Sequence, residues 1–296
     1  MLHGQPASNP VRLVVLGTRG FVARAVTTHA AELGWNVLAC SASDLDLTDR
    51  ASVDRLATQL TAADTIVMTS ALTPDRGKDL GTMTRNLAMA EHVCAALEKQ
   101  PCAHVVYVGS DAVYDDAETM VRESSQVNPS SLHGVMHFTR EQMFVHTCGR
   151  LRIALARLRP SLLFGPGDTH NGYGPNRFAR AAVFDGRIAL FGNGEEQRDH
   201  VFIDDVSRVI AEVARRRSDG VLNMATGRSC SFRRVAELIA SRAGRPVRIE
   251  PSARANPVVH RHFDVTGLIA HFPHMSLTPL EAGLDRTVAA LSTRRG

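Results

Sequence analysis

The chain has 296 residues, of which 44% are hydrophobic and 22% charged, and its formal net charge is +4. This length allows one large domain or two unequal ones, and so mild a charge excludes the strongly basic surface typical of nucleic-acid-binding proteins. The five cysteines lack metal-ligand spacing, no segment reaches the ~20 apolar residues of a membrane span, and residues 1–10 lack the apolar stretch of a signal peptide. We therefore expect a cytoplasmic globular protein that binds neither nucleic acid nor membranes.

In the first half of the chain, short apolar runs alternate with longer segments of helical periodicity. Continuously apolar runs predict strands buried on both faces, and apolar residues three and four apart predict helices between them. This alternation is typical of the α/β class with a Rossmann-type doubly wound parallel sheet. The expected strands are 11–16, 36–39, 65–69, 104–108 and 152–158, and the expected helices are 21–33, 51–60, 83–99 and 132–145.

A glycine-rich turn follows the first expected strand and opens the first expected helix. Gly17 permits the tight turn, and Gly20 lets the backbone approach a pyrophosphate. The amides and the dipole of the helix N-terminus attract the charge of that group. The turn therefore predicts an NAD(P) site formed by Gly17, Thr18, Arg19, Gly20, Phe21 and Val22.

The end of the second expected strand affects the choice of cofactor. An acidic residue there usually holds the adenosine ribose of NAD, but residues 40–43 read Cys-Ser-Ala-Ser. Arg19 either faces the 2′-phosphate of NADP or is solvated, so NADP is slightly favoured over NAD. Farther along the chain, Asp46 and Leu47 are expected to hold the edge and the face of the adenine.

After Pro160 the sequence becomes richer in loops that contain glycine and proline. We expect residues 1–165, with a later contribution around 200–226, to form a dinucleotide-binding domain. Residues 166–296 are expected to form a smaller α/β domain that holds a substrate against it. Helical periodicity in this second part covers 177–184, 204–217, 232–243 and 279–291.

Several motifs together resemble the extended short-chain dehydrogenase/reductase family, in its NAD-dependent epimerase/dehydratase branch, which modifies nucleotide sugars. The resemblance implies a nucleotide-sugar substrate and a homodimer that pairs through the helices 83–99 and 132–145. It covers nearly the whole chain and rests on residues 17–23, 45–49, 70–72, 106–114, 158–167, 190–206 and 223–227.

The resemblance also implies roles for residues of the first domain. Ser70, Ala71 and Asn86 correspond to cofactor contacts of the family. Ser110 corresponds to the hydroxyl that binds the reacting sugar oxygen, and Asp111 stands where dehydratases carry a catalytic aspartate.

On the substrate side, Arg198 corresponds to an arginine that contacts the nucleotide diphosphate, because a guanidinium suits phosphate. The alternative for Arg198 is a structural ion pair with Asp199 or Asp205. Arg261 is a second phosphate candidate. Many relatives carry an asparagine that contacts the diphosphate where this chain has Leu162, so that contact is either lost or supplied by Asn176.

The chain departs from the family at its catalytic pair, where a tyrosine and, four residues later, a lysine are replaced by His133 and His137. Residues four apart share one helix face, so the spacing is kept. In one interpretation His133 is the acid/base, because imidazole titrates near neutral pH, and His137 helps to place the nicotinamide. In a second, Tyr173 or Asp111 moves the proton. In a third, redox chemistry is lost and the pocket only binds.

A zinc site formed by His133, His137 and Glu141 is a further alternative, since the three are four residues apart. The glutamate that zinc proteases carry beside the first histidine is missing, and a cofactor loop lies upstream, so no metal is expected. The sequence therefore predicts NAD(P)-dependent epimerisation, dehydration or keto reduction of a nucleotide-activated sugar by hydride transfer. The alternative is a catalytically silent protein that binds a dinucleotide or a sugar nucleotide.

Overall fold

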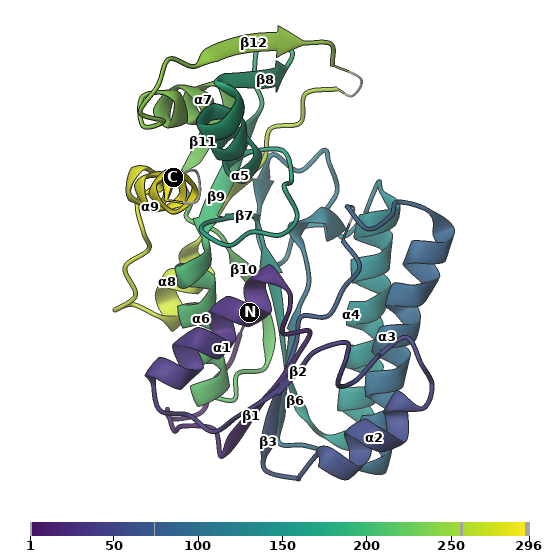
Figure 1. Cartoon of the computed structure of the whole chain (residues 1–296). Helices are drawn as coiled ribbons and strands as arrows, with labels where there is room; N and C mark the ends of the chain where they lie inside the picture. The colour runs from purple at the N-terminus through teal and green to yellow at the C-terminus, as the bar shows by residue number, and fades with distance from the viewer. Residues whose placement is uncertain (1, 74, 255–256, 294–296) are drawn as a thin grey trace.

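The computed structural model describes residues 2–73, 75–254 and 257–293 (Figure 1). At its centre lies a six-stranded sheet in the order β10-β6-β4-β3-β1-β2, in which every neighbouring pair is parallel. Its strands are β1 (Arg12–Leu16), β2 (Val37–Cys40), β3 (Asp64–Met68), β4 (His104–Val108), β6 (Ala154–Pro160) and β10 (Gly220–Met224).

Helices cover both faces of this sheet, which explains why its strands are apolar on both sides (Figure 1). Along β1, Leu13 and Val15 point into one hydrophobic core, and Val14 and Leu16 point into the other. The helices are α1 (Phe21–Glu32) and α6 (Ile203–Arg215) on one face, and α2 (Ser52–Gln59), α3 (Leu80–Lys99) and α4 (Leu132–Leu151) on the other.

The strand order reverses at β1, which lies between β2 and β3. In open parallel sheets, ligands bind in the crevice beyond the carboxyl ends of the strands at such a reversal. The loops that follow β1 and β3 therefore border the place where a ligand is expected.

A second, less regular region lies beyond the upper end of the sheet in Figure 1. Its strands are short. Residues 187–191 alternate between exposed and buried positions, and none of the residues 229–231 and 248–252 is buried, so no continuous apolar run predicts these strands. One sheet joins β7 (Leu162–Phe164), β9 (Gln197–Phe202) and β11 (Ser229–Ser231), another joins β8 (Arg187–Phe191) and β12 (Arg248–Ser252), and β5 (Met120–Val121) pairs with β13 (His262–Phe263). Its helices are α5 (Pro175–Arg180), α7 (Phe232–Ala240) and α9 (Leu280–Ser292), whereas α8 (Thr266–His271) packs against β10 of the central sheet (Figure 1).

The strands and helices expected in the first half are confirmed, with shifts at their ends. The helix expected over 132–145 continues to Leu151, because the buried Phe144 and Cys148 extend its apolar stripe. It ends at Arg152, whose φ of 57° is left-handed, so β6 begins later than expected. The helix expected over 177–184 is instead the short α5 followed by a π-helical turn, Ala181–Asp185.

Two late elements join the first half of the chain. β10 is an edge strand of the central sheet, and α6 packs against α1. Both fall in or close to the stretch around 200–226 that the sequence assigns to the dinucleotide-binding domain. Within the described ranges, no helix is long and apolar enough to cross a membrane.

Candidate functional site

A cavity of about 540 Å³ lies where the sheet predicts a ligand, at the ends of β1 and β3. Its walls come from both regions of the molecule, since segments 160–163 and 168–176 face the loops of the central sheet. The expected site residues that line it are Gly17, Arg19, Gly20, Phe21, Val22, Asp46, Leu47, Ser70, Ala71, Ser110, Asp111, His133, His137, Tyr173 and Asn176.

The glycine loop leaves no room for side chains. Gly17 has a φ of +96°, and a Cβ on it would lie 2.7 Å from the Ser70 hydroxyl oxygen. A Cβ on Gly20 would lie 3.1 Å from the carbonyl oxygen of Gly17. α1 begins directly afterwards with no side-chain cap, so its first amides remain available to an anion. These residues fit the diphosphate of a dinucleotide.

Polar side chains cluster at the end of β2, where the adenosine is expected. Arg19 donates to the Ser43 hydroxyl at 3.0 Å, and the Ser41 and Ser43 hydroxyls are 2.7 Å apart. The Asp44 carboxylate accepts from the backbone and the hydroxyl of Ser41, and these bonds lower the pKa of Asp44. The hydroxyls and Arg19 therefore form a polar cradle with one carboxylate at its side.

Asn86, expected at the cofactor, lies one layer behind the cavity lining. Its side-chain amide accepts from the N–H of Leu72 at 2.8 Å and donates to the carbonyl of Leu72 at 2.9 Å. Leu72 itself lines the cavity. Asn86 therefore holds the exit of β3 in place rather than lining the cavity.

Close packing brings the start of α4 against the turn that carries Ser110. Ser110 caps the short helical turn Asp111–Val113 by accepting from the amide of Ala112 at 3.1 Å. Gly134, in the first turn of α4, touches this turn so closely that a Cβ would lie 2.1 Å from the Ala112 carbonyl oxygen. This contact places His133, the neighbour of Gly134, in the cavity wall that Ser110 and Asp111 also line.

The two histidines of α4 contact each other, as their spacing predicts, and their ring centroids are 4.6 Å apart. Burial lowers the pKa of His133, and Asp111 partly offsets this effect. Burial also lowers the pKa of His137 well below its ordinary value, and the neighbouring His133 and Arg140 lower it further. Both imidazoles are therefore neutral near pH 7, so His137 does not supply the positive charge of the lysine it replaces.

His137 is also tied to the sheet. Its Nδ1 lies 3.0 Å from the hydroxyl oxygen of Tyr107, a fully buried residue of β4. Nδ1 of His137 is therefore occupied by Tyr107. If His137 helps to place the nicotinamide, as the sequence predicts, it must do so through Nε2.

Arg140, to which none of the sequence motifs points, supports the cavity wall from behind without lining it. It lies two turns beyond His133 on α4, is only 1% exposed, and donates to the Ser70 carbonyl oxygen at 2.6 Å. Its guanidinium also lies 5.6 Å from the centre of the Tyr107 ring. The seven-residue spacing from His133 was the available signal, since residues one or two turns apart share a face.

Glu141 does not join the two histidines. Arg159 of β6 binds its carboxylate through two hydrogen bonds, at 2.6 and 3.0 Å. The pair is buried and ties α4 to the sheet. In the described part of the chain, no three His, Cys, Asp or Glu side chains are grouped as metal ligands.

The two arginines expected to meet the diphosphate are held elsewhere and do not line the cavity. Arg198 pairs with Glu196 at 2.7 Å, rather than with either aspartate considered for it. Arg261 is 2% exposed and donates to the Asp111 carbonyl at 2.9 Å and to Asp116 at 2.8 Å. Arg261 thus braces the turn after Ser110.

Tyr173 and Asn176 line the cavity but already have partners. The Tyr173 hydroxyl accepts from the amide of Phe191 at 2.8 Å, and its ring stacks on Phe191 with centroids 4.4 Å apart. Burial raises the pKa of Tyr173, so its phenol keeps its proton near neutral pH and is a poor base. Asn176 accepts from the amide of Gly165 at 3.0 Å and so fixes the Gly-Pro-Gly loop formed by residues 165–167.

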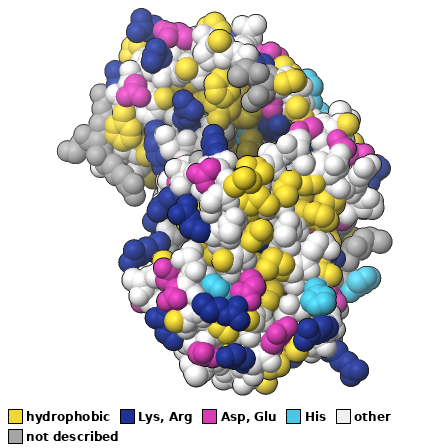
Figure 2. All heavy atoms as spheres, turned by 90° about the vertical axis from the view of Figure 1, so that its right-hand side faces the viewer, with side chains coloured by type: hydrophobic (Ala, Val, Ile, Leu, Met, Phe, Trp, Pro, Cys, Tyr) yellow, Lys and Arg dark blue, Asp and Glu magenta, His cyan; other side chains and the backbone are white. Residues whose placement is uncertain are grey.

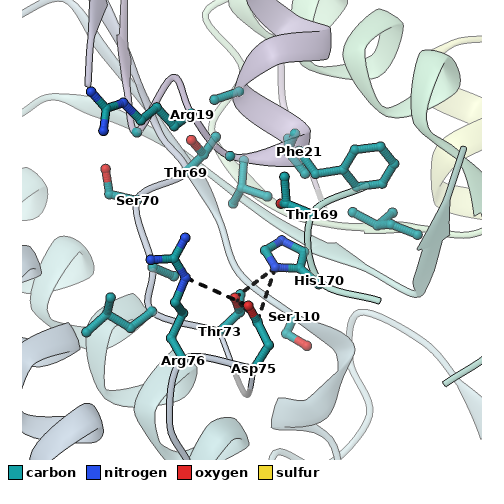
Figure 3. A pocket seen from close by; sticks show the side chains of 18 of the residues that line it. Arg19, Phe21, Thr69, Ser70, Thr73, Asp75, Arg76, Ser110, Thr169 and His170 are labelled. Carbon is teal, nitrogen blue, oxygen red and sulfur yellow. Dashed lines mark hydrogen bonds and ion pairs between the residues drawn. The ribbon is translucent and has the colours of Figure 1, made fainter. Parts of the chain in front are cut away.

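A second polar cluster spans the cavity between the two regions (Figure 3). The His170 Nδ1 lies 2.9 Å from the Thr73 hydroxyl and 3.3 Å from Asp75, and the Thr73 hydroxyl donates to Asp75 at 2.6 Å. Arg76 stands beside Asp75 at 3.8 Å. Sequence spacing cannot reveal this cluster, because His170 is 95 residues from Asp75.

The comparisons with known proteins agree with this architecture. The chain matches the NAD dependent epimerase/dehydratase family over residues 13–225. It is similar to the structure of MoeE5 in complex with UDP-glucose and NAD, with 23% identity, a TM-score of 0.82, and coverage of 96% of this chain and 99% of that one. It is also similar to UDP-glucose 4-epimerase from Thermotoga maritima with UDP-glucose, with 19% identity, a TM-score of 0.84, and coverage of 96% and 100%.

A third similar structure is RMD from Pseudomonas aeruginosa complexed with NADPH, with 18% identity, a TM-score of 0.84, and coverage of 96% of this chain and 99% of that one. At these identities the likeness shows a common fold. Because the family match spans most of the chain, the protein belongs to the NAD-dependent epimerase/dehydratase family.

Proposed function

We propose that the protein is an NAD(P)-dependent enzyme that modifies a nucleotide-activated sugar by hydride transfer at a sugar carbon. Epimerisation, dehydration and keto reduction all start from this chemistry. The observation that carries the proposal is one cavity in which the glycine loop, Ser110 and His133 lie together. Family membership and similar structures that hold UDP-glucose or a nicotinamide cofactor support it.

In this proposal the bound nicotinamide supplies the hydride acceptor or donor. Ser110 binds the reacting sugar oxygen through its hydroxyl. His133 accepts the proton of that oxygen, because a neutral imidazole is a competent base near pH 7. His137 packs against the ring of His133 and fixes its orientation, since Tyr107 anchors His137 in turn. Asp111 favours the protonated form of His133 once the proton has moved.

For the cofactor, we propose a small preference for NADP over NAD. Arg19 with the hydroxyls of Ser41 and Ser43 offers the donors that a 2′-phosphate needs. The preference is expected to be small because the Asp44 carboxylate, bound to Ser41, adds a negative charge beside them.

We further propose that the protein forms a homodimer through α3 and α4 and works in the cytoplasm. Figure 2 faces the side on which these helices lie and shows hydrophobic side chains gathered there. Leu80, Leu132 and Val145 are the large exposed hydrophobic residues of the two helices. The five cysteines are free thiols, which suits a reducing compartment.

The test is product analysis by mass. The purified protein is incubated with NAD or NADP, oxidised or reduced, and a panel of UDP-, GDP- and dTDP-sugars. Loss of water identifies a dehydratase, a gain of two hydrogens a reductase, and a shift in retention at constant mass an epimerase. Cofactor binding without conversion of any sugar supports the silent binding protein instead.

A further inference from the structure

The cluster of His170, Thr73 and Asp75 joins two segments that face each other across the cavity. His170 belongs to the segment between β7 and α5, residues 165–174, which we call the strap. Thr73 and Asp75 belong to the loop between β3 and α3. All three line the same cavity as the glycine loop. In Figure 3 one ring nitrogen of His170 faces Thr73 and Asp75, and the other is turned away from them.

The hydrogen bonds define which nitrogen carries the proton. The Thr73 hydroxyl has one hydrogen, which it donates to Asp75 at 2.6 Å, so its oxygen accepts from His170 Nδ1–H at 2.9 Å. In the neutral ring Nε2 is then an acceptor, which repels an anionic oxygen. Protonation turns Nε2 into a charged donor, and it also strengthens the pair with Asp75.

The surroundings favour this role. Besides Thr73 and Asp75, the charged groups around His170 are Arg76 in the facing loop, Asp168 in its own strap, and Arg180 of α5, which pairs with Asp168. Asp168 accepts from the backbone amide of His170 at 3.0 Å. This bond fixes the backbone of the strap, while the imidazole of His170 contacts the loop between β3 and α3. The Asp75 carboxylate keeps a lowered pKa, because bonds from Thr73 and His170 outweigh the effect of burial.

We propose that His170 is an additional cofactor-binding residue. Its protonated imidazole binds Asp75 through one ring nitrogen and an anionic oxygen of the bound dinucleotide through the other. These two bonds hold the strap against the cofactor. This inference rests on the proposed dinucleotide site. It predicts that the affinity for the cofactor falls as pH rises and the imidazole loses its proton.

The experiment measures the dissociation constant of NAD⁺ by calorimetry at several pH values between about pH 6 and pH 8.5. NAD⁺ is the probe because its diphosphate keeps its charge over this range, unlike the additional phosphate of NADP⁺. We expect the wild-type affinity to fall by about fivefold or more over this range, as the loss of a charged hydrogen bond implies. His170→Gln and Asp75→Asn should abolish most of this dependence and bind NAD⁺ more weakly at the acid end.

His274→Gln is the matched control, since His274 is an exposed histidine between α8 and α9 and does not line the cavity. It should keep the wild-type profile. A His170→Gln variant that retains the wild-type pH dependence would overturn the proposed role of His170 and leave the proposed function intact. Failure of NAD⁺ and NADP⁺ to bind the wild-type protein at any pH would overturn both.

Discussion

At the scale of single residues, the proposed chemistry depends on an imidazole in the place of a phenol. His133 lines the same cavity as Ser110, and its contact with His137 restricts its orientation. Tyr173 is a second candidate base. Its hydroxyl already accepts a hydrogen bond from the backbone amide of Phe191. This contact counts against Tyr173 and supports the proposal that His133 is the base.

His133→Gln removes the proposed base and keeps a polar side chain of similar size. We expect turnover of the sugar identified by product analysis to fall by roughly 10²–10⁴-fold, the usual contribution of general acid–base catalysis. Cofactor affinity, measured by calorimetry, should stay close to the wild-type value. Unchanged turnover would exclude His133 as the base.

The pH dependence of kcat/KM provides a second test of His133. The proton acceptor must be neutral, so the rate of alcohol oxidation should decline as pH falls through its pKa. Because burial lowers the pKa of His133, the decline should lie below the ordinary imidazole value of about 6.5. A decline confined to pH values above neutrality would point to another group.

At the scale of elements, the position of α4 against the Ser110 turn decides where His133 stands in the cavity wall. Its first turn rests on the Ser110 turn at Gly134, and its middle is tied to β6 by the Glu141–Arg159 pair. These two contacts can be tested separately.

Gly134→Ala should force α4 away from the Ser110 turn, because the new Cβ would lie 2.1 Å from a backbone oxygen. We expect a loss of about 1–3 kcal/mol of unfolding free energy, as for other overpacked sites, together with lower turnover. Gly149→Ala is the control on the same helix, since nothing lies within 4 Å of its Cβ position. There, denaturant unfolding should show a gain of about 0.5–1 kcal/mol from helix propensity.

Glu141→Ala should leave the Arg159 guanidinium buried without its carboxylate. Breaking a buried pair in this way typically costs about 3–5 kcal/mol, which urea unfolding would detect. Glu98→Ala removes a partner from the exposed pair with Arg150 and should change stability little. Equal effects of the two substitutions would contradict the structural role given to Glu141.

At the scale of the whole molecule, the outer face of α3 and α4 is the proposed dimer interface. Val145→Glu places a charge on this face and should shift the sedimentation of the protein toward a monomer. Val11→Glu, at an exposed valine away from these helices, should leave it unchanged. A wild-type protein that sediments as a monomer at micromolar concentration would contradict the proposal.

The sequence alone determined the order of strands and helices from β1 to β6, apart from the two-residue β5, as well as the glycine loop and the shared face of the two histidines. These features depend on periodicity and on residues close together in the chain, for which backbone geometry sets the outcome. Tertiary structure decided the protonation states of the side chains and the partners that they bind. Burial keeps His137 neutral, and packing assigns Arg261 to the Ser110 turn. It also brings His170 to Asp75, because contacts between distant segments follow from how whole elements pack rather than from local spacing.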